Sequence, residues 1–263
     1  MNDNHARRPR WVIGNWKQHK LTAEANALAA EVAEHTAALD GVHVGVAPSL
    51  VTLASVANNV ANRAVTVFGQ TCGLHDAGAF TGDIGPEMLV DAGAGGVLLG
   101  HSERRALAHV TSSEVATKAA LALSAKLHVV VCVGEPLDIR EAGTHETFVK
   151  SMLLDSLEGV DLDADSAGQL IVAYEPVWAI GTGKTATALE AGAMHQALRA
   201  TLDARFGTHG ARVPLLYGGS VKPANAAGLF EPSFVDGFLV GGAALDARSF
   251  VDIVSVTAKA RRP

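Results

Sequence analysis

Short apolar runs alternate with amphipathic stretches along this chain. The apolar runs are rich in Val, Ile and Leu and occur at 11–14, 42–47, 65–69, 97–99, 128–133, 170–174, 213–217 and 236–240. Each run is nearly continuous rather than alternating between apolar and polar positions, which is typical of a parallel strand covered on both faces. The pattern therefore predicts eight buried parallel strands.

An amphipathic segment follows each predicted strand. These segments cover 22–38, 49–60, 86–92, 111–126, 144–157, 187–206, 223–230 and 246–260. Several carry helix start signals, such as Pro86 in a first turn and Thr187 three residues before Glu190. Eight strand–helix pairs in series are compatible with an α/β fold of either of two kinds, a closed (β/α)₈ barrel or a doubly wound open sheet.

Length favours the barrel and a single domain. The chain has 263 residues, close to the roughly 250 residues that a closed barrel of this kind takes, and no Pro-, Gly- or Ser-rich linker divides it. We expect residues 1–10, which are polar and basic, to form a disordered arm, and residues 11–263 to form one catalytic barrel domain. The longest connection without periodicity, 71–85, predicts a functional loop.

Composition excludes several classes of protein. With 48% hydrophobic and 18% charged residues the chain can bury a large core, so global disorder is excluded. A net charge of -6 offers no basic surface for nucleic acid or an anionic membrane, although a local positive pocket for a small anion remains compatible with it. Two cysteines are too few for a disulfide scaffold, and no apolar run reaches the ~18 residues of a membrane span. We therefore expect a cytoplasmic protein.

Polar residues gather where the predicted strands end. Asn15 and Lys17 follow the first strand, His101 and Glu103 follow the fourth, and Glu175 follows the sixth. In a barrel the carboxyl ends of the strands share one rim, and that rim carries the chemistry. A cation, an imidazole and a carboxylate on one rim suit proton transfer on a small phosphorylated substrate.

Each of these residues can be interpreted as part of a catalytic site or as an ordinary structural residue. Glu175 precedes a proline at a hinge, where loop closure would make it a stronger base, but it could equally form an exposed salt bridge. His101 precedes a helix start that favours neutral imidazole, able to polarise a carbonyl, or it packs between helices. Lys17 suits an enediolate or a phosphate. Asn15 orients the lysine or a substrate oxygen, or caps a turn, and Glu103 is at least a first-turn helix charge.

Glycine-rich turns predict a phosphate site on the same rim. Glycine lets backbone N–H groups approach an anion, and the eighth-strand turn precedes a helix start. The candidate phosphate-binding residues are Gly181, Ser220, Gly241 and Gly242.

Other ligands fit the sequence poorly. The stretch 178–185 resembles the end of a nucleotide-binding P-loop, but Trp178 stands at the required first glycine. A dinucleotide fingerprint at 181–186 lacks the tight turn after the strand, because five residues separate Glu175 from Gly181. The eleven histidines are scattered rather than clustered. We expect neither a cofactor nor a metal. A Schiff-base aldolase needs a lysine at a strand end, and only Lys17 and Lys184 come close to such a position.

The motifs resemble those of the triosephosphate isomerase family. The most specific is Ala173-Tyr-Glu-Pro-Val-Trp-Ala-Ile-Gly-Thr-Gly183, and the resemblance extends from Trp11 to the end of the chain. It implies a TIM barrel that interconverts dihydroxyacetone phosphate and D-glyceraldehyde 3-phosphate through an enediolate, a step of glycolysis and gluconeogenesis. It also implies that Glu175 is the base, that His101 polarises the carbonyl, and that Glu103 supports the lysine and the histidine.

The resemblance further implies a homodimer, in which the 71–85 loop enters the partner and Thr81 approaches the partner's active site. Asp83 and the run after Arg105 depart from the family near that surface. Two alternatives remain: an isomerase of a tetrulose phosphate such as erythrulose phosphate, and a non-catalytic sugar-phosphate-binding paralogue. The residues around Asn15, the stretch 176–184 and the eighth-strand glycines favour the triose substrate, while the catalytic set argues against the paralogue.

Overall fold

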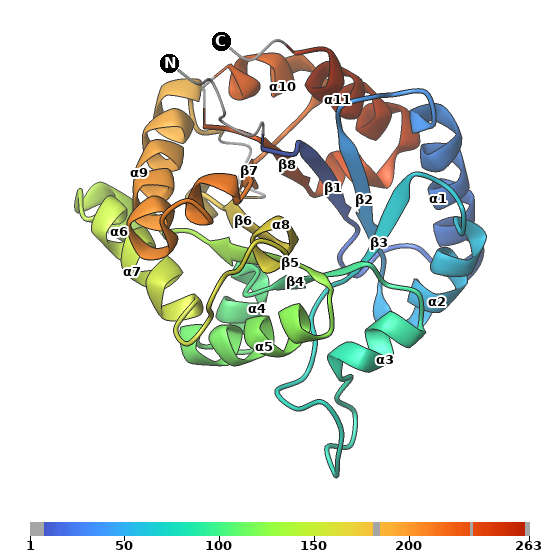
Figure 1. Ribbon diagram of the computed structural model, residues 1–263. Coiled ribbons are helices and arrows are strands. Elements are labelled where there is room, and N and C mark those ends of the chain that lie inside the picture. The colour runs from blue at the N-terminus through green and yellow to red at the C-terminus, as the bar shows by residue number, and fades with distance from the viewer. Residues whose placement is uncertain (1–7, 181–184, 232–233, 261–263) are drawn as a thin grey trace.

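Eight parallel strands follow one another around a closed barrel, and the last pairs with the first (Figure 1). The computed structural model describes residues 8–180, 185–231 and 234–260. The strands are β1 Trp11–Asn15, β2 His43–Ala47, β3 Val65–Gly69, β4 Gly96–Leu99, β5 His128–Val133, β6 Leu170–Tyr174, β7 Leu215–Tyr217 and β8 Gly237–Val240. The closed barrel is confirmed over the open sheet, and each predicted strand end lies within two residues of the observed one.

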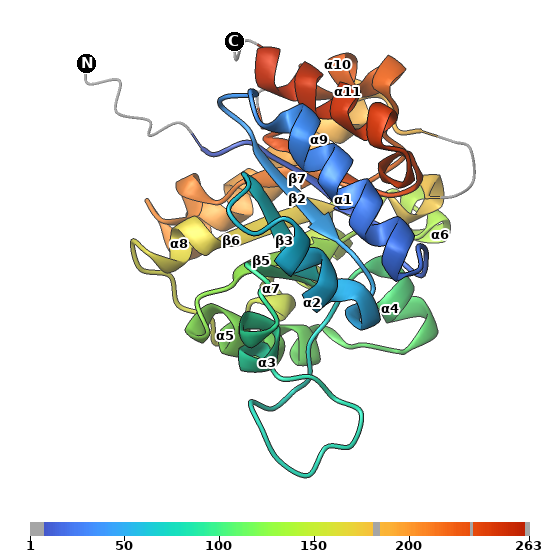
Figure 2. The ribbon, with the colours of Figure 1, turned by 90° about the vertical axis from the view of Figure 1, so that its right-hand side faces the viewer.

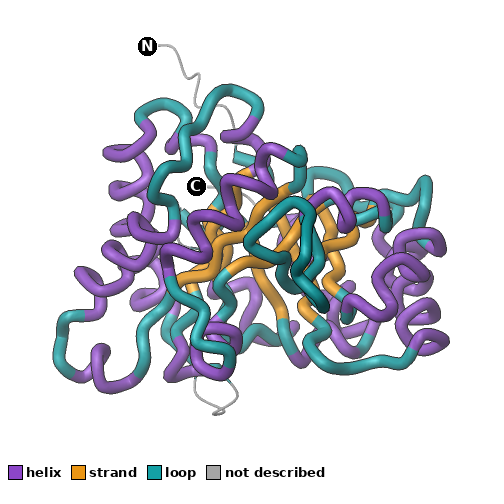
Figure 3. Tube along the Cα trace, turned by 90° about the horizontal axis from the view of Figure 1, so that it is seen from below, coloured by secondary structure: helices purple, strands orange, loops and turns teal. Residues whose placement is uncertain are grey.

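Helices surround the strands on the outside of the barrel (Figure 3). The principal helices are α1 Thr22–Thr36, α2 Leu50–Asn59, α3 Pro86–Asp91, α5 Ser112–Ser124, α7 His145–Ser156, α9 Ala188–Phe206, α10 Pro223–Phe230 and α11 Ala247–Lys259. The predicted start of α9 is confirmed, since the Thr187 side chain accepts a hydrogen bond from the Glu190 N–H and the Glu190 carboxylate accepts one from the Thr187 N–H.

Three short helices complete the outer layer: α4 Ser102–Leu107, α6 Leu137–Glu141 and α8 Ser166–Gln169. The expected helix start at Ser102 is confirmed by α4. The sequence did not predict α6 and α8, because four or five residues are too few to show a helical period. No helix in the described part of the chain is long and apolar enough to cross a membrane.

Phe68 is one of the large side chains that fill the barrel interior. It is fully buried, and glycines flank it on the two neighbouring strands. A Cβ atom at Gly45 would lie 2.6 Å from the Phe68 ring, and one at Gly96 would approach it to 2.3 Å. The ring therefore occupies space that larger side chains on β2 and β4 would take, and the close-packed interior leaves the strand ends as the place for a site.

The described chain begins with two arginines that bind the barrel. Arg8 Nε lies 2.9 Å from Asp236 Oδ2, and Asp236 is fully buried. Arg10 donates hydrogen bonds to the carbonyl oxygens of Thr257 and Ala260, at the C-terminal end of α11. The prediction of a disordered arm over residues 1–10 is therefore wrong for residues 8–10, because the two guanidinium groups bind a carboxylate and carbonyl oxygens at a helix end. Residues 1–7 lie outside the described part.

The 71–85 connection extends away from the barrel body (Figure 2). Its base is closed by a hydrogen bond from the Gly73 N–H to the Ile84 carbonyl, at 2.8 Å. Its tip is ordered by His75 and Phe80, whose rings stack with centroids 3.8 Å apart. The long loop is thus a defined projection that contributes little to the barrel core.

Candidate active site

The carboxyl ends of the strands enclose a cavity of about 490 Å³, which we call the main cavity. Eight of the nine predicted site residues line it: Asn15, Lys17, His101, Glu103, Glu175, Ser220, Gly241 and Gly242. Barrel closure brings these residues together from five different strand ends. The ninth predicted residue, Gly181, lies outside the described residues.

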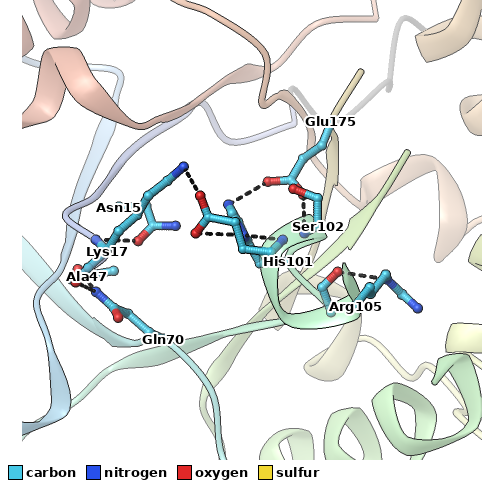
Figure 4. A network of polar contacts seen from close by, with 10 residues as sticks. Asn15, Lys17, Ala47, Gln70, His101, Ser102, Arg105 and Glu175 are labelled. Carbon is cyan, nitrogen blue, oxygen red and sulfur yellow. Dashed lines mark hydrogen bonds and ion pairs between the residues drawn. The ribbon is translucent and has the colours of Figure 1, made fainter. Parts of the chain in front are cut away.

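Glu175 is held at the edge of the main cavity by backbone groups. Its carboxylate is 1% exposed, and Oε2 accepts a hydrogen bond of 2.8 Å from the Ser102 N–H (Figure 4). Its own N–H donates to the Val133 carbonyl. A Cβ at Gly134 would lie 1.7 Å from the Glu175 carbonyl oxygen, so only glycine lets β5 approach this closely.

His101 faces the same carboxylate and is fixed in one tautomer. As the N-cap of α4 it accepts a hydrogen bond at Nδ1 from the Glu103 N–H, at 3.2 Å. The neutral ring therefore carries its proton on Nε2, which lies 3.0 Å from Glu175 Oε1. This contact is not aligned as a hydrogen bond, and Oε1 has no hydrogen-bond donor among the described residues. One oxygen of Glu175 is thus available to accept a proton, next to a ring N–H that can donate.

Lys17 approaches the cavity from β1. Its ammonium lies 2.5 Å from Glu103 Oε1, while Glu103 Oε2 lies 3.8 Å from His101 Nδ1. The Glu103 carboxylate therefore contacts both the lysine and the histidine.

The Lys17 backbone adopts a left-handed conformation, with φ 51°, which is uncommon for a residue with a side chain. The Asn15 side chain accepts a hydrogen bond from the Lys17 N–H at 3.0 Å. Gln70 Nε2 donates to the Lys17 carbonyl at 2.8 Å and to the Ala47 carbonyl at 3.0 Å (Figure 4). Sequence reasoning missed Gln70, although its place as the polar residue just after the third strand was a usable signal.

Arg105 supports the turn that carries His101. Its Nε donates to the Gly100 carbonyl at 2.8 Å, and its Nη2 donates to the Cys132 carbonyl and the Ser156 hydroxyl. Burial lowers the pKa of the Arg105 guanidinium, and the nearby Cys132 and Glu175 oppose that shift. Sequence reasoning gave this arginine no role in the site, because its acceptors lie on separate elements.

The residues after β6 are fixed by a buried carboxylate from the neighbouring loop. Glu135 accepts hydrogen bonds from the Tyr174 hydroxyl at 3.0 Å and from Trp178 Nε1 at 2.8 Å. Arg140 lies 3.6 Å from Glu135 and donates to Glu190 at 3.0 Å. Burial, followed by the charge of Glu135, raises the pKa of Tyr174. This network joins the segment after β5 to segments on both sides of residues 181–184, which lie outside the described part.

The turns after β7 and β8, where the sequence predicts a phosphate site, also line the main cavity. Glycine is required at Gly219, where a Cβ would lie 2.2 Å from the Tyr217 hydroxyl. The Ser220 carbonyl accepts a hydrogen bond from Asn225 Nδ2 at 3.1 Å. A Cβ at Gly241 would lie 3.7 Å from Lys17 Cε, so this turn borders the lysine. A small anion between these turns would face a positive charge.

Fold and site define a barrel of the isomerase class, with a carboxylate, a histidine and a lysine around one cavity. A family model described as triosephosphate isomerase matches residues 10–257. The chain is 42% identical to a triosephosphate isomerase of Prosthecochloris aestuarii over 96% of this chain and 99% of the relative. It is 44% identical to one of Ruegeria over 94% of this chain and 97% of the relative.

A solved structure gives the same result. The triosephosphate isomerase of Bartonella henselae matches with a TM-score of 0.86 and 33% identity, over 95% of this chain and 100% of that one. The chain therefore belongs to the triosephosphate isomerase family of aldose–ketose isomerases. Among the residues described here, no group of three or more His, Cys, Asp or Glu side chains could hold a metal ion.

Proposed function

We propose that this protein interconverts dihydroxyacetone phosphate and D-glyceraldehyde 3-phosphate. The observation that carries the proposal is the placement of Glu175 Oε1 3.0 Å from His101 Nε2, at the cavity that Lys17 also lines. Isomerisation of an α-hydroxy ketone needs a base at carbon and a proton donor at oxygen, and these two atoms supply both within one substrate length.

Glu175 takes a proton from one substrate carbon and returns it to the neighbouring carbon. His101 donates its Nε2 proton to the carbonyl oxygen and takes a proton back from the neighbouring hydroxyl, and the Lys17 charge stabilises the negative charge that develops on these oxygens. Glu103 orients Lys17 and, through its backbone N–H, fixes the His101 tautomer. Asn15 accepts from the Lys17 N–H and so sets the lysine backbone.

The phosphate binds where the turns after β7 and β8 border the main cavity. Ser220, Gly241 and Gly242 border it there, and backbone N–H groups at glycine turns are suited to a phosphate. We assign Gly181 to the same phosphate site from its place in the sequence.

A coupled assay with a panel of sugar phosphates tests the proposal. We expect turnover with both triose phosphates, in either direction and without added cofactor. Turnover of a tetrulose phosphate with no rate above buffer for either triose phosphate would replace the substrate class. Binding of triose phosphate without turnover would instead identify a non-catalytic protein.

We also propose a homodimer formed through the 71–85 loop, in the cytoplasm. The loop projects from the barrel, and its Phe80 and the adjacent Met88 are 42% and 58% exposed. Apolar side chains on a projection are suited to burial in a partner. Sedimentation at micromolar concentration should give twice the chain mass of 27.1 kDa; a fully active monomer would overturn the dimer.

A further inference from the structure

A second cavity lies behind Glu175, on the side away from Lys17. It has a volume of about 260 Å³ and lies between the turn after β4, the end of β5 and helix α7; we call it the rear cavity. Much of its wall is apolar, with Ala106 from α4, Phe148 and Met152 from α7, and Val177 after β6. The cavity opens to solvent, since Ala106 and Pro136 at its rim are exposed, and clefts lined mainly by apolar side chains accept apolar ligands.

The polar groups of the rear cavity are already satisfied by neutral partners. Arg105 donates to two carbonyl oxygens, of Gly100 and Cys132, and to the hydroxyls of Ser112 and Ser156. Burial raises the pKa of the Cys132 thiol, which keeps it uncharged. Four of the five guanidinium N–H groups are thus already engaged, so a charged ligand would lose its hydration and gain few new hydrogen bonds. The wall suits a neutral molecule, and the volume, below the roughly 300 Å³ at which drug-sized sites begin, limits it to one or two rings.

Glu175 separates the two cavities. Among the described residues it is the only one that lines both. Its Oε2 accepts from the Ser102 N–H, and Ser102 lines the rear cavity, while its Oε1 lies beside His101 in the main cavity (Figure 4). A molecule packed in the rear cavity would contact Glu175 and its anchor without occupying the space of the substrate.

We propose that the rear cavity is a second ligand site for small neutral aromatic molecules, and that its occupancy lowers turnover through Glu175. A ligand packed against Ser102 and Glu175 holds the Glu175 carboxylate in its hydrogen bond to the Ser102 N–H. The carboxylate then moves less readily toward the substrate carbon from which it takes the proton. Phosphate binding at the turns after β7 and β8 is left intact, because these turns do not line the rear cavity. The effect on turnover rests on the proposed role of Glu175, whereas ligand binding in the cavity does not.

Methionine labelling tests the binding directly, with indole as the probe. The chain has 4 methionines; Met152 lines the rear cavity, Met88 is exposed on α3 and Met194 is buried in α9. With carbon-13 methyl labels, indole should shift the Met152 signal by its ring current and leave Met88 and Met194 unmoved. Met152→Leu assigns the signal. No shift of Met152, or equal shifts of all the methyl groups, would overturn the site.

Filling the cavity supplies the matched control. Ala106→Phe should weaken indole binding at least tenfold, because the added ring takes the space of the ligand. Ala108→Phe, at an exposed position that does not line the cavity, should leave binding unchanged. Equal indole affinity in Ala106→Phe and the parent protein would contradict the assignment of the site.

Kinetics test the coupling to Glu175. Saturating indole should lower kcat at least threefold with KM for triose phosphate unchanged, and Ala106→Phe should be resistant. Competitive inhibition would place indole in the main cavity and overturn the proposal, as would an unchanged kcat when the Met152 shift is complete. A parent protein without any turnover would contradict the proposed function and leave the Met152 shift to decide the site.

Discussion

Lys17 and Glu103 form an ion pair of 2.5 Å between the end of β1 and helix α4. The lysine side chain is 27% exposed and the glutamate side chain 45% exposed, so water weakens the attraction. The pair therefore does more to orient the lysine than to stabilise the barrel.

Glu103→Gln should consequently lower activity strongly while changing stability little. We expect turnover to fall by about 10²-fold, the scale of a misplaced catalytic group, while the free energy of unfolding changes by no more than about 1 kcal/mol. Assay and thermal unfolding measure the two effects. Glu146→Gln breaks the exposed pair with Lys150 and serves as the control, with no change in rate. Normal turnover in Glu103→Gln would remove Glu103 from the site.

Glu175→Gln removes the base but keeps the shape and the acceptor oxygen for the Ser102 N–H. Loss of general base catalysis should lower kcat by at least ~10²–10⁴-fold, with circular dichroism and melting close to those of the parent protein. The exposed Glu141→Gln is the matched control. A near-normal rate for Glu175→Gln would mean that another group takes the proton.

Gln70→Met tests the support of the strained lysine backbone. It removes the hydrogen bonds to the Lys17 and Ala47 carbonyls, which should cost about 1–3 kcal/mol of stability. Because Lys17 would also lose its fixed position, we expect kcat/KM to fall as well. Gln196→Met on the exposed face of α9 should change neither quantity. Lower stability with unchanged kinetics would limit Gln70 to a structural role.

Stability should depend on pH through three histidines whose pKa is lowered because the folded protein removes water from them. Burial lowers the pKa of His195, His43 and His128, and for His128 the neighbouring His43 adds to this effect. The unfolded chain binds protons at these side chains more readily than the folded protein. The free energy of unfolding is therefore highest above about pH 6.5 and falls as the pH drops below that value.

Urea unfolding between pH 8 and pH 5 measures this slope. His195→Gln, which cannot take up the proton, should show a shallower decline on the acid side. His195 is fully buried and its Nδ1 contacts the Ala191 carbonyl, so the variant will start from a lower stability. The test therefore compares how steeply the free energy of unfolding falls with pH, not its value at pH 8. An unchanged slope in His195→Gln would exclude His195 as a contributor to the pH dependence.

Sequence periodicity and chain length together predicted the barrel and its rim. Each apolar run stops at Gly, Pro or a polar residue, and parallel strands place these stops at one end of the barrel. Asn15, Lys17, His101 and Glu175 could therefore be assigned to one site before any contact was known. Local capping signals likewise predicted the start of α9 at Thr187.

Contacts between distant segments were decided by the tertiary structure alone. Gln70 reaches the Lys17 carbonyl across 53 positions, Lys17 pairs with Glu103 across 86, and Arg8 binds Asp236 across 228. No local pattern encodes these pairs, because each forms only when barrel closure brings separate strands side by side. The sequence by itself determined which residues stand at the rim; the closed barrel decided which of them touch, and it made Glu175 the wall between two cavities.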